Sequence, residues 1–143
     1  MDLSGIRTAP LRDASLDDAE LAVLAVPSRA FAEIVASLGG RCPVLILTKG
    51  LDPATGDRLS LLVRDRPVAV LSGPNHAEEL AQGLPAATVV ASEGARLATE
   101  LQTALHSSTL RVYVNDDVTG VELCGAAKNV IAIAAGAVDG LRL

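Results

Sequence analysis

The chain has 143 residues, half of them hydrophobic, and a formal net charge of −5. This length fits one domain with a sizeable core, although Phe31 and Tyr113 are its only large aromatic residues. The acidic balance and the lack of aromatic side chains argue against a nucleic-acid binder that depends on a basic face or on base stacking. Cys42 and Cys124 are far apart and match no metal-ligand spacing, so we expect reduced thiols and no metal site.

The start of the chain carries no recognisable targeting signal. The stretch from Met1 to Gly5 is polar and has no basic segment before an apolar run, which argues against a signal peptide. The longest apolar run lies near residues 130–138 and is too short to span a bilayer. We therefore expect a cytoplasmic protein without membrane insertion.

After a polar arm at residues 1–20, which we expect to be irregular with a short helix near Asp13–Ala19, apolar runs alternate with helical segments. Continuous apolar runs are typical of strands buried on both faces, and Pro, Gly and capping residues mark the turns between them. The predicted strands lie at residues 21–26, 43–48, 67–71, 87–91 and 110–114. The predicted helices lie at residues 28–38, 57–63, 75–82 and 94–106. This alternation predicts an α/β fold: a partial, Rossmann-like, mostly parallel sheet with crossover helices.

The last predicted element begins at residue 119 and differs from the others. Thr119 and Glu122 have the spacing of a capping box, in which each side chain satisfies a free amide at the helix start. From there to about Val138 the sequence is apolar nearly all round, which is typical of a buried helix. We therefore predict a sheet domain at residues 21–118 and a long, buried apolar helix at residues 119–143.

Lys128 is the most unusual residue of that helix, because it shares a helical face with Val121, Cys124 and Ile131. A buried, unpaired ammonium is costly, and desolvation favours its neutral form. Such a lysine can accept or return a proton. A lysine that reaches water from a helix end, or that pairs with a carboxylate such as Glu122, is the structural alternative. The pattern leaves both interpretations open.

Polar groups also follow two of the predicted strands. Lys49 follows the strand at 43–48, and Ser72-Gly73-Pro74-Asn75 follows the strand at 67–71. Ligands of open α/β sheets collect at the carboxyl ends of strands, and free amides at a helix start attract anions. An ordinary tight turn with an Asn cap is the alternative. Together with Lys128, these groups suit a small substrate that carries a phosphate.

Five segments, in order along the chain, carry a family resemblance. They are Val26-Pro27-Ser28, Thr48-Lys49-Gly50-Leu51, residues 72–79 with Gly83-Leu84-Pro85, residues 111–113 with 116–123, and residues 125–136 with Asp139-Gly140-Leu141. With these segments the chain resembles the bacterial-type NAD(P)-dependent glycerol-3-phosphate dehydrogenases from about residue 20 to its end. The resemblance implies a dinucleotide-binding α/β domain that leads into a helical substrate domain.

The resemblance also implies a reaction and a set of site residues. Dihydroxyacetone phosphate and sn-glycerol 3-phosphate would be interconverted with NAD or NADP, a step of glycerophospholipid biosynthesis, and Lys128 would be the proton acceptor. The residues implied to contact the substrate are Lys49, Gly73, Asn75, Lys128 and Asn129. The residues implied to lie against the cofactor are Lys49, Ala77 and Pro27.

The chain also departs from the family. No Gly-x-Gly-x-x-Gly turn, which would hold a pyrophosphate, occurs in it, and Arg142-Leu143 does not continue the family pattern. We therefore expect a chain truncated at both ends that is poorly active or inactive by itself. Two other interpretations remain: a non-catalytic module whose apolar helix pairs with a partner or with a second copy as a homodimer, and a related two-domain hydroxy-acid dehydrogenase.

Overall fold

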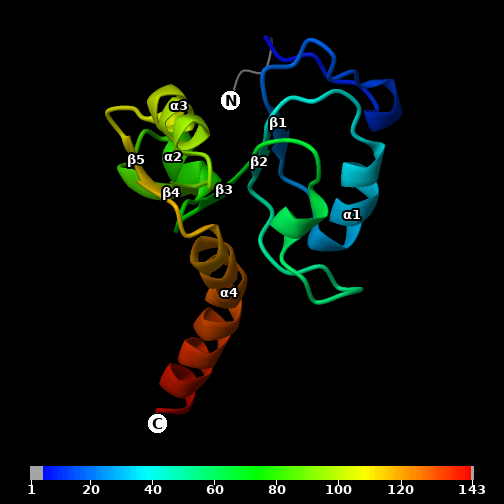
Figure 1. Cartoon of the computed structure of the whole chain (residues 1–143). Coiled ribbons are helices and arrows are strands. Elements are labelled where there is room, and N and C mark those ends of the chain that lie inside the picture. The colour runs from blue at the N-terminus through cyan, green and yellow to red at the C-terminus, as the bar shows by residue number, and fades with distance from the viewer. Residues whose placement is uncertain (1–4, 143) are drawn as a thin grey trace.

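The computed structural model describes residues 5–142, so the first four residues of the predicted arm and Leu143 lie outside the described part. Five strands form a single sheet in the order β1-β2-β3-β4-β5 (Figure 1). The strands are β1 (Ala22–Leu24), β2 (Val44–Ile46), β3 (Val68–Ser72), β4 (Ala86–Ala91) and β5 (Leu110–Asn115). The helices are η1 (Leu11–Asp13), α1 (Ser28–Ser37), η2 (Leu59–Leu62), α2 (Ala77–Ala81), α3 (Ala95–Leu105) and α4 (Val118–Leu141).

The sheet is mixed but mostly parallel, which confirms the predicted α/β class. β1, β2 and β3 run parallel to one another, and β4 and β5 form a second parallel pair. Only β3 and β4 are antiparallel. The reason lies in α2, whose five residues span about 8 Å at the rise of an α-helix, whereas β3 spans about 17 Å. So short a helix cannot carry the chain back along the sheet, and β4 begins near the end of β3.

Helices and hydrophobic side chains cover both faces of the sheet. On one face, Phe31 of α1 and Leu59 of η2 pack with Val44 and Ile46 of β2, and the start of α4 joins this cluster through Val118. On the other face, residues of α3 pack against the central strands; this cluster contains Leu45, Ala69, Val90, Leu97, Ala98, Leu101 and Val112. Successive residues of β2 therefore point to opposite faces and are all buried, as the continuous apolar run predicted.

Several predicted helices are shorter than expected. The helix predicted at 57–63 is a single 3₁₀ turn, η2, and the arm contains the 3₁₀ turn η1 instead of a helix at 13–19. The helix predicted at 75–82 is reduced to α2 and begins after His76, so Asn75 does not cap it. Of these segments only η2 packs against α1 and β3, while η1 and α2 contain no buried residue, so little burial supports a longer helix there.

The capping box predicted for α4 is wrong. The helix begins one residue earlier, and the side chain of Asp117 caps it by accepting a hydrogen bond from the Gly120 amide at 2.7 Å. Asp is among the best N-cap residues, and its carboxylate also suits the positive end of the helix dipole. Glu122 is thereby free to turn away from the helix start, toward η2.

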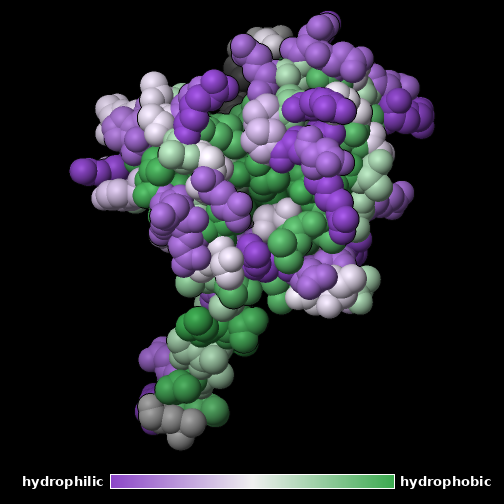
Figure 2. All heavy atoms as spheres, viewed as in Figure 1, coloured by the Kyte–Doolittle hydropathy of each residue, from purple (hydrophilic) through white to green (hydrophobic). Residues whose placement is uncertain are grey.

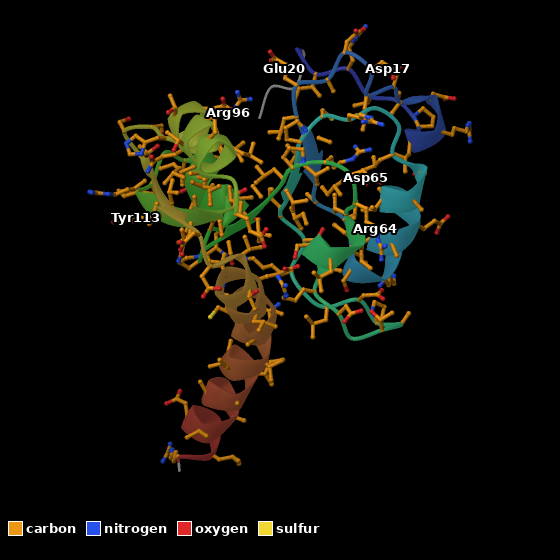
Figure 3. All side chains as sticks on the ribbon, in the orientation of Figure 1. Asp17, Glu20, Arg64, Asp65, Arg96 and Tyr113 are labelled. Carbon is orange, nitrogen blue, oxygen red and sulfur yellow. The ribbon has the colours of Figure 1, made fainter. Side chains whose placement is uncertain are left out.

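The final helix is long and apolar as predicted, but its predicted burial is wrong. Only Val118, Glu122 and Gly125 of α4 are buried, and the second half projects beyond the sheet as an apolar rod (Figures 1 and 2). Charged side chains such as Glu20, Asp65 and Arg96 lie over the sheet region, away from this projecting end (Figure 3). By length and composition alone α4 could cross a bilayer, a test that core helices of soluble proteins also meet.

Candidate functional site

The carboxyl ends of β1, β2 and β3 meet at one edge of the sheet because the three strands are parallel. Pro27, Lys49 and Gly73 follow these strands, so the fold brings all three residues to this edge. The buried side chain of Thr48 ties two strand ends together: its hydroxyl accepts a hydrogen bond from the Val26 amide and donates one to the Val26 carbonyl at 2.9 Å. The edge is therefore a defined surface rather than a set of loose turns.

Lys49 connects the ends of β2 and β3. Its side chain is exposed, and Nζ donates a hydrogen bond to the carbonyl oxygen of Gly73 at 3.2 Å. Partial burial, together with the nearby positive charge of Lys128, lowers the pKa of Lys49 below its ordinary value of 10.5. The second cause places the two ammonium groups within electrostatic reach of each other, although 79 residues of sequence, from 49 to 128, separate them.

Helix α4 brings Lys128 to the same edge. The helix begins at the opposite edge, where β5 ends, and passes the end of β3 at Gly125. A Cβ atom at Gly125 would lie 2.8 Å from Ser72 Oγ, so glycine lets the helix approach the strand closely. Lys128 follows about 4.5 Å further along the helix axis, beyond the end of β3. It is half-buried, which lies between the buried lysine and the water-reaching lysine that the pattern left open.

The remaining predicted site residues differ in exposure. Asn75 is half-buried, and its Oδ1 atom is buried without a hydrogen-bond partner in residues 5–142. Ala77 is the exposed first residue of α2, and the exposed Pro27 precedes α1. Asn129 is exposed next to Lys128 on α4. A cavity of about 470 Å³ lies at the opposite edge, and neither lysine lines it.

Gly73 has a packing role that the sequence did not indicate. A Cβ atom there would lie 2.9 Å from the carbonyl oxygen of Ala87 and 3.0 Å from Thr88 Cα. The space in front of Gly73 is therefore filled by the backbone of β4. This packing alone requires a glycine here, and the Gly73 carbonyl also orients Lys49.

Comparison with known proteins gives the family of this site. Residues 5–98 match the family model described as NAD-dependent glycerol-3-phosphate dehydrogenase N-terminus. The chain belongs to this family. Residues 117–143 match the C-terminus model of the same dehydrogenases, and this second match begins just before α4. Both matches confirm the resemblance found in the sequence.

The curated relatives are glycerol-3-phosphate dehydrogenases that use NAD(P)+. The chain is 56% identical to the one from Deinococcus radiodurans over 129 residues, which are 87% of this chain and 39% of the relative. It is 44% identical to the one from Legionella pneumophila over 132 residues, which are 88% of this chain and 40% of the relative. The chain thus spans about two fifths of the length of these dehydrogenases.

Solved structures show the same fold. Glycerol-3-phosphate dehydrogenase from Coxiella burnetii superimposes with a TM-score of 0.80 at 38% identity, covering 89% of this chain and 41% of that one. The structure of DsGPDH from Dunaliella salina gives a TM-score of 0.83 at 25% identity, covering 95% of this chain and 25% of that one. These similarities confirm a Rossmann-like dehydrogenase fold for the family member described here.

The sequence did not predict the partners of Glu122 in this dehydrogenase chain. Glu122 is 4% exposed and accepts hydrogen bonds from the Ser60 amide at 2.9 Å, the Ser60 hydroxyl at 2.6 Å and Arg58 Nη1 at 3.4 Å. The alternative in which Glu122 neutralises Lys128 is therefore wrong, because its carboxylate is already satisfied elsewhere. A glutamate on an otherwise apolar helix was the only signal of such a contact.

Proposed function

We propose that this chain carries the catalytic lysine and part of the substrate site of an NAD(P)-dependent glycerol-3-phosphate dehydrogenase. The complete enzyme would reduce dihydroxyacetone phosphate to sn-glycerol 3-phosphate in the cytoplasm, for glycerophospholipid biosynthesis. The observation that supports this most directly is the close approach of α4 to the end of β3 at Gly125, which brings Lys128 to the sheet edge where Lys49 contacts Gly73. In the proposed arrangement residues 21–118 belong to the dinucleotide domain, and residues 119–143 lead into the helical substrate domain.

Two neighbouring ammonium groups favour a compact anion. Each repels the other, and in residues 5–142 neither forms a salt bridge with a carboxylate. A phosphate would relieve this repulsion and accept hydrogen bonds from both. We propose that Lys49, Gly73, Asn75, Lys128 and Asn129 contact the substrate. Because Asn75 Oδ1 lacks a partner, it can accept a hydrogen bond from a substrate hydroxyl or from an amide of the cofactor.

The cofactor would lie along the same edge, against Lys49, Ala77 and Pro27. The exposure of these residues and the unpaired Asn75 Oδ1 fit such a ligand, although they do not discriminate NAD from NADP. When bound there, the reduced nicotinamide would supply a hydride for C2 of the substrate. Lys128 gives a proton to the C2 oxygen in this direction and accepts it in reverse. Lys49 contributes positive charge to the bound anion and keeps its place through the Gly73 carbonyl.

The proposal is tested by ligand binding to the two lysines, which are the only lysines in the chain. Protein carrying isotope-labelled lysine is titrated with dihydroxyacetone phosphate, and the side-chain NMR signals are followed. We expect both signals to move with the phosphorylated ligand and neither to move with dihydroxyacetone. Unchanged signals at millimolar ligand would contradict the proposed substrate site.

Activity is a separate measurement. Because the sequence contains no Gly-x-Gly-x-x-Gly turn for the pyrophosphate, we expect the chain by itself to oxidise NAD(P)H with dihydroxyacetone phosphate very slowly. Turnover comparable to that of a full-length relative would show that this expectation is wrong. Loss of the remaining turnover in Lys128→Met would support Lys128 as the proton-transfer residue.

The exposed half of α4 favours a second candidate, a non-catalytic interaction module. Val130, Ile131 and Ile133 are more than half exposed, and apolar surface of this kind normally marks an interface or an aggregation risk. In this interpretation the helix pairs with a partner or with a second copy. The two candidates separate in the NMR titration, because an interaction module has no reason to bind dihydroxyacetone phosphate at its lysines.

A further inference from the structure

The connection between β2 and β3 carries Lys49 at its start and a contact to α4 near its end. Leu51 and Arg58 form a β-bridge that closes this connection into a hairpin. Asp52 is buried inside it, where Oδ2 accepts hydrogen bonds from the amide and the hydroxyl of Thr55 at 3.1 and 2.9 Å. The Asp52 amide in turn donates to the Asp57 carbonyl at 2.9 Å. The bridge and this internal network hold Arg58 beside Leu51, which follows Lys49 by two residues.

Glu122 connects α4 to the end of this hairpin. Both carboxylate oxygens are used: Oε1 accepts from the Ser60 amide, while Oε2 accepts from the Ser60 hydroxyl and faces Arg58 Nη1. A buried carboxylate that lost these partners would be strongly disfavoured. The contact therefore specifies one rotation and one height of α4 against η2.

Gly125 provides a second contact of α4, and this contact is a close approach to β3 rather than a set of hydrogen bonds. The close approach of Gly125 to Ser72 allows α4 to lie against β3, but it contains no hydrogen bond in residues 5–142 that would stop the helix from sliding or turning. At 3.6 residues per turn, Glu122 and Lys128 lie about 120° apart around the helix. The Lys128 side chain therefore cannot contact the Glu122 carboxylate. The direction in which Lys128 points nevertheless depends on the rotation of α4 that Glu122 fixes.

We infer that Glu122 is a positioning residue, which through Ser60 and the closed hairpin 51–58 holds Lys128 opposite Lys49. A role of Glu122 in catalysis rests on the proposed function, whereas its role in holding the position of Lys128 does not. A helix that turned or slid would separate the two ammonium groups even if the sheet stayed intact. The Glu122 contact therefore couples the position of the proton-transfer lysine to the connection that presents Lys49.

The pKa of Lys49 reports this geometry without any need for activity. It is measured by NMR titration of isotope-labelled lysine in the 143-residue chain and in variants. Lys128→Met removes one cause of the lowered pKa, so we expect the pKa of Lys49 to rise but to stay below its ordinary value, because desolvation remains. We expect Glu122→Gln and Ser60→Ala to raise it in the same direction, as Lys128 moves away.

A matched control removes a carboxylate from the surface. Glu93 is exposed, and we expect Glu93→Gln to leave the pKa of Lys49 unchanged. Loss of the negative charge of Glu122 would by itself lower the pKa of a nearby lysine. A rise in Glu122→Gln therefore reports movement of Lys128 and not the direct effect of the substitution.

Two results would overturn the inference. One is a pKa of Lys49 that rises in Lys128→Met but stays at the wild-type value in Glu122→Gln and Ser60→Ala. The other is no rise in Lys128→Met, since the two ammonium groups would then not be neighbours. If Glu122→Gln does not fold, Ser60→Ala decides alone, because it removes one hydroxyl from a half-buried position. Failure of the proposed function would appear separately, as lysine side-chain NMR signals that do not shift when dihydroxyacetone phosphate is added.

Discussion

At the residue scale, the pKa of Lys49 and the packing of Gly73 both depend on neighbours that are distant in the sequence. Lys49 is exposed, yet its pKa is lowered by partial burial and by Lys128. Gly73 lacks a side chain because the backbone of β4 occupies the space, and its carbonyl holds Lys49. Each residue therefore serves the fold and the site at once, and the two roles call for different tests.

The lowered pKa of Lys49 predicts how phosphate binding depends on pH. A bound phosphate favours the charged lysine, so the pKa of Lys49 should rise in the complex and binding should take up a proton between the two pKa values. Affinity for dihydroxyacetone phosphate should be highest below the pKa of free Lys49 and fall as the pH rises through it. Calorimetry over a pH series measures this. The Lys49→Arg variant stays positively charged, so its binding of dihydroxyacetone phosphate should take up less proton than that of the wild type. Equal proton uptake by the two proteins would assign the titration to another group.

Substitution of Gly73 should lower stability. In Gly73→Ala the new Cβ would press on backbone atoms of Ala87 and Thr88 that cannot move aside alone. We expect a loss of about 1–3 kcal/mol in the free energy of unfolding, the usual cost of overpacking. Gly39→Ala is the control, since nothing lies within 4 Å of that position. Urea denaturation that gave equal stability for both variants would show that β3 and β4 separate easily here.

At the scale of elements, strands followed their sequence pattern more closely than helices did. Each predicted strand is present. Burial on both faces, which the apolar runs predicted, holds fully for β2, whereas β5 is mostly exposed. The segments at 57–63 and 75–82 became one 3₁₀ turn and one short helix, because connections across a sheet edge are shaped by what they contact. The predicted start of α4 was wrong for a related reason. Asp117 and Thr119 are both candidate N-cap residues, and the local sequence pattern does not tell them apart.

The two candidate caps of α4 can be separated by mutation. Asp117→Ala removes the acceptor for the Gly120 amide and should cost about 0.5–2 kcal/mol, the usual value of an N-cap. Thr119→Ala should change stability by less than about 0.5 kcal/mol, because Thr119 is exposed and does not cap the helix. Thermal unfolding of both variants makes the comparison. A larger loss for Thr119→Ala would restore the capping box predicted from sequence.

At the scale of the whole molecule, the sheet region is covered on both faces while the far half of α4 is not. Figure 2 shows this half as mostly apolar with a few hydrophilic residues along one side, and Ile133 is 75% exposed. The match to the C-terminus model of the family begins at residue 117, so α4 falls within the C-terminal part of these dehydrogenases.

Exposure of this helix predicts self-association of the chain as it stands. Ile133→Lys should reduce association in sedimentation experiments, because a charge on the apolar surface must be desolvated when two helices pack. Leu61→Lys, at an exposed position of η2 that is 52% accessible, should leave association unchanged. A wild-type chain that sediments as a clean monomer at high concentration would argue against a paired helix.

The sequence by itself determined the α/β class, the strand positions and the family, because apolar periodicity and short motifs are properties of neighbouring residues. Only the tertiary structure decided which distant residues meet. The antiparallel β4, the packing around Gly73 and the contact of Glu122 with Ser60, 62 positions away, depend on how the sheet is assembled. The same holds for the two lysines. The sequence shows Lys49 at the end of an apolar strand and Lys128 within an apolar helix. The effect of Lys128 on the pKa of Lys49 exists only because α4 passes the edge of the sheet.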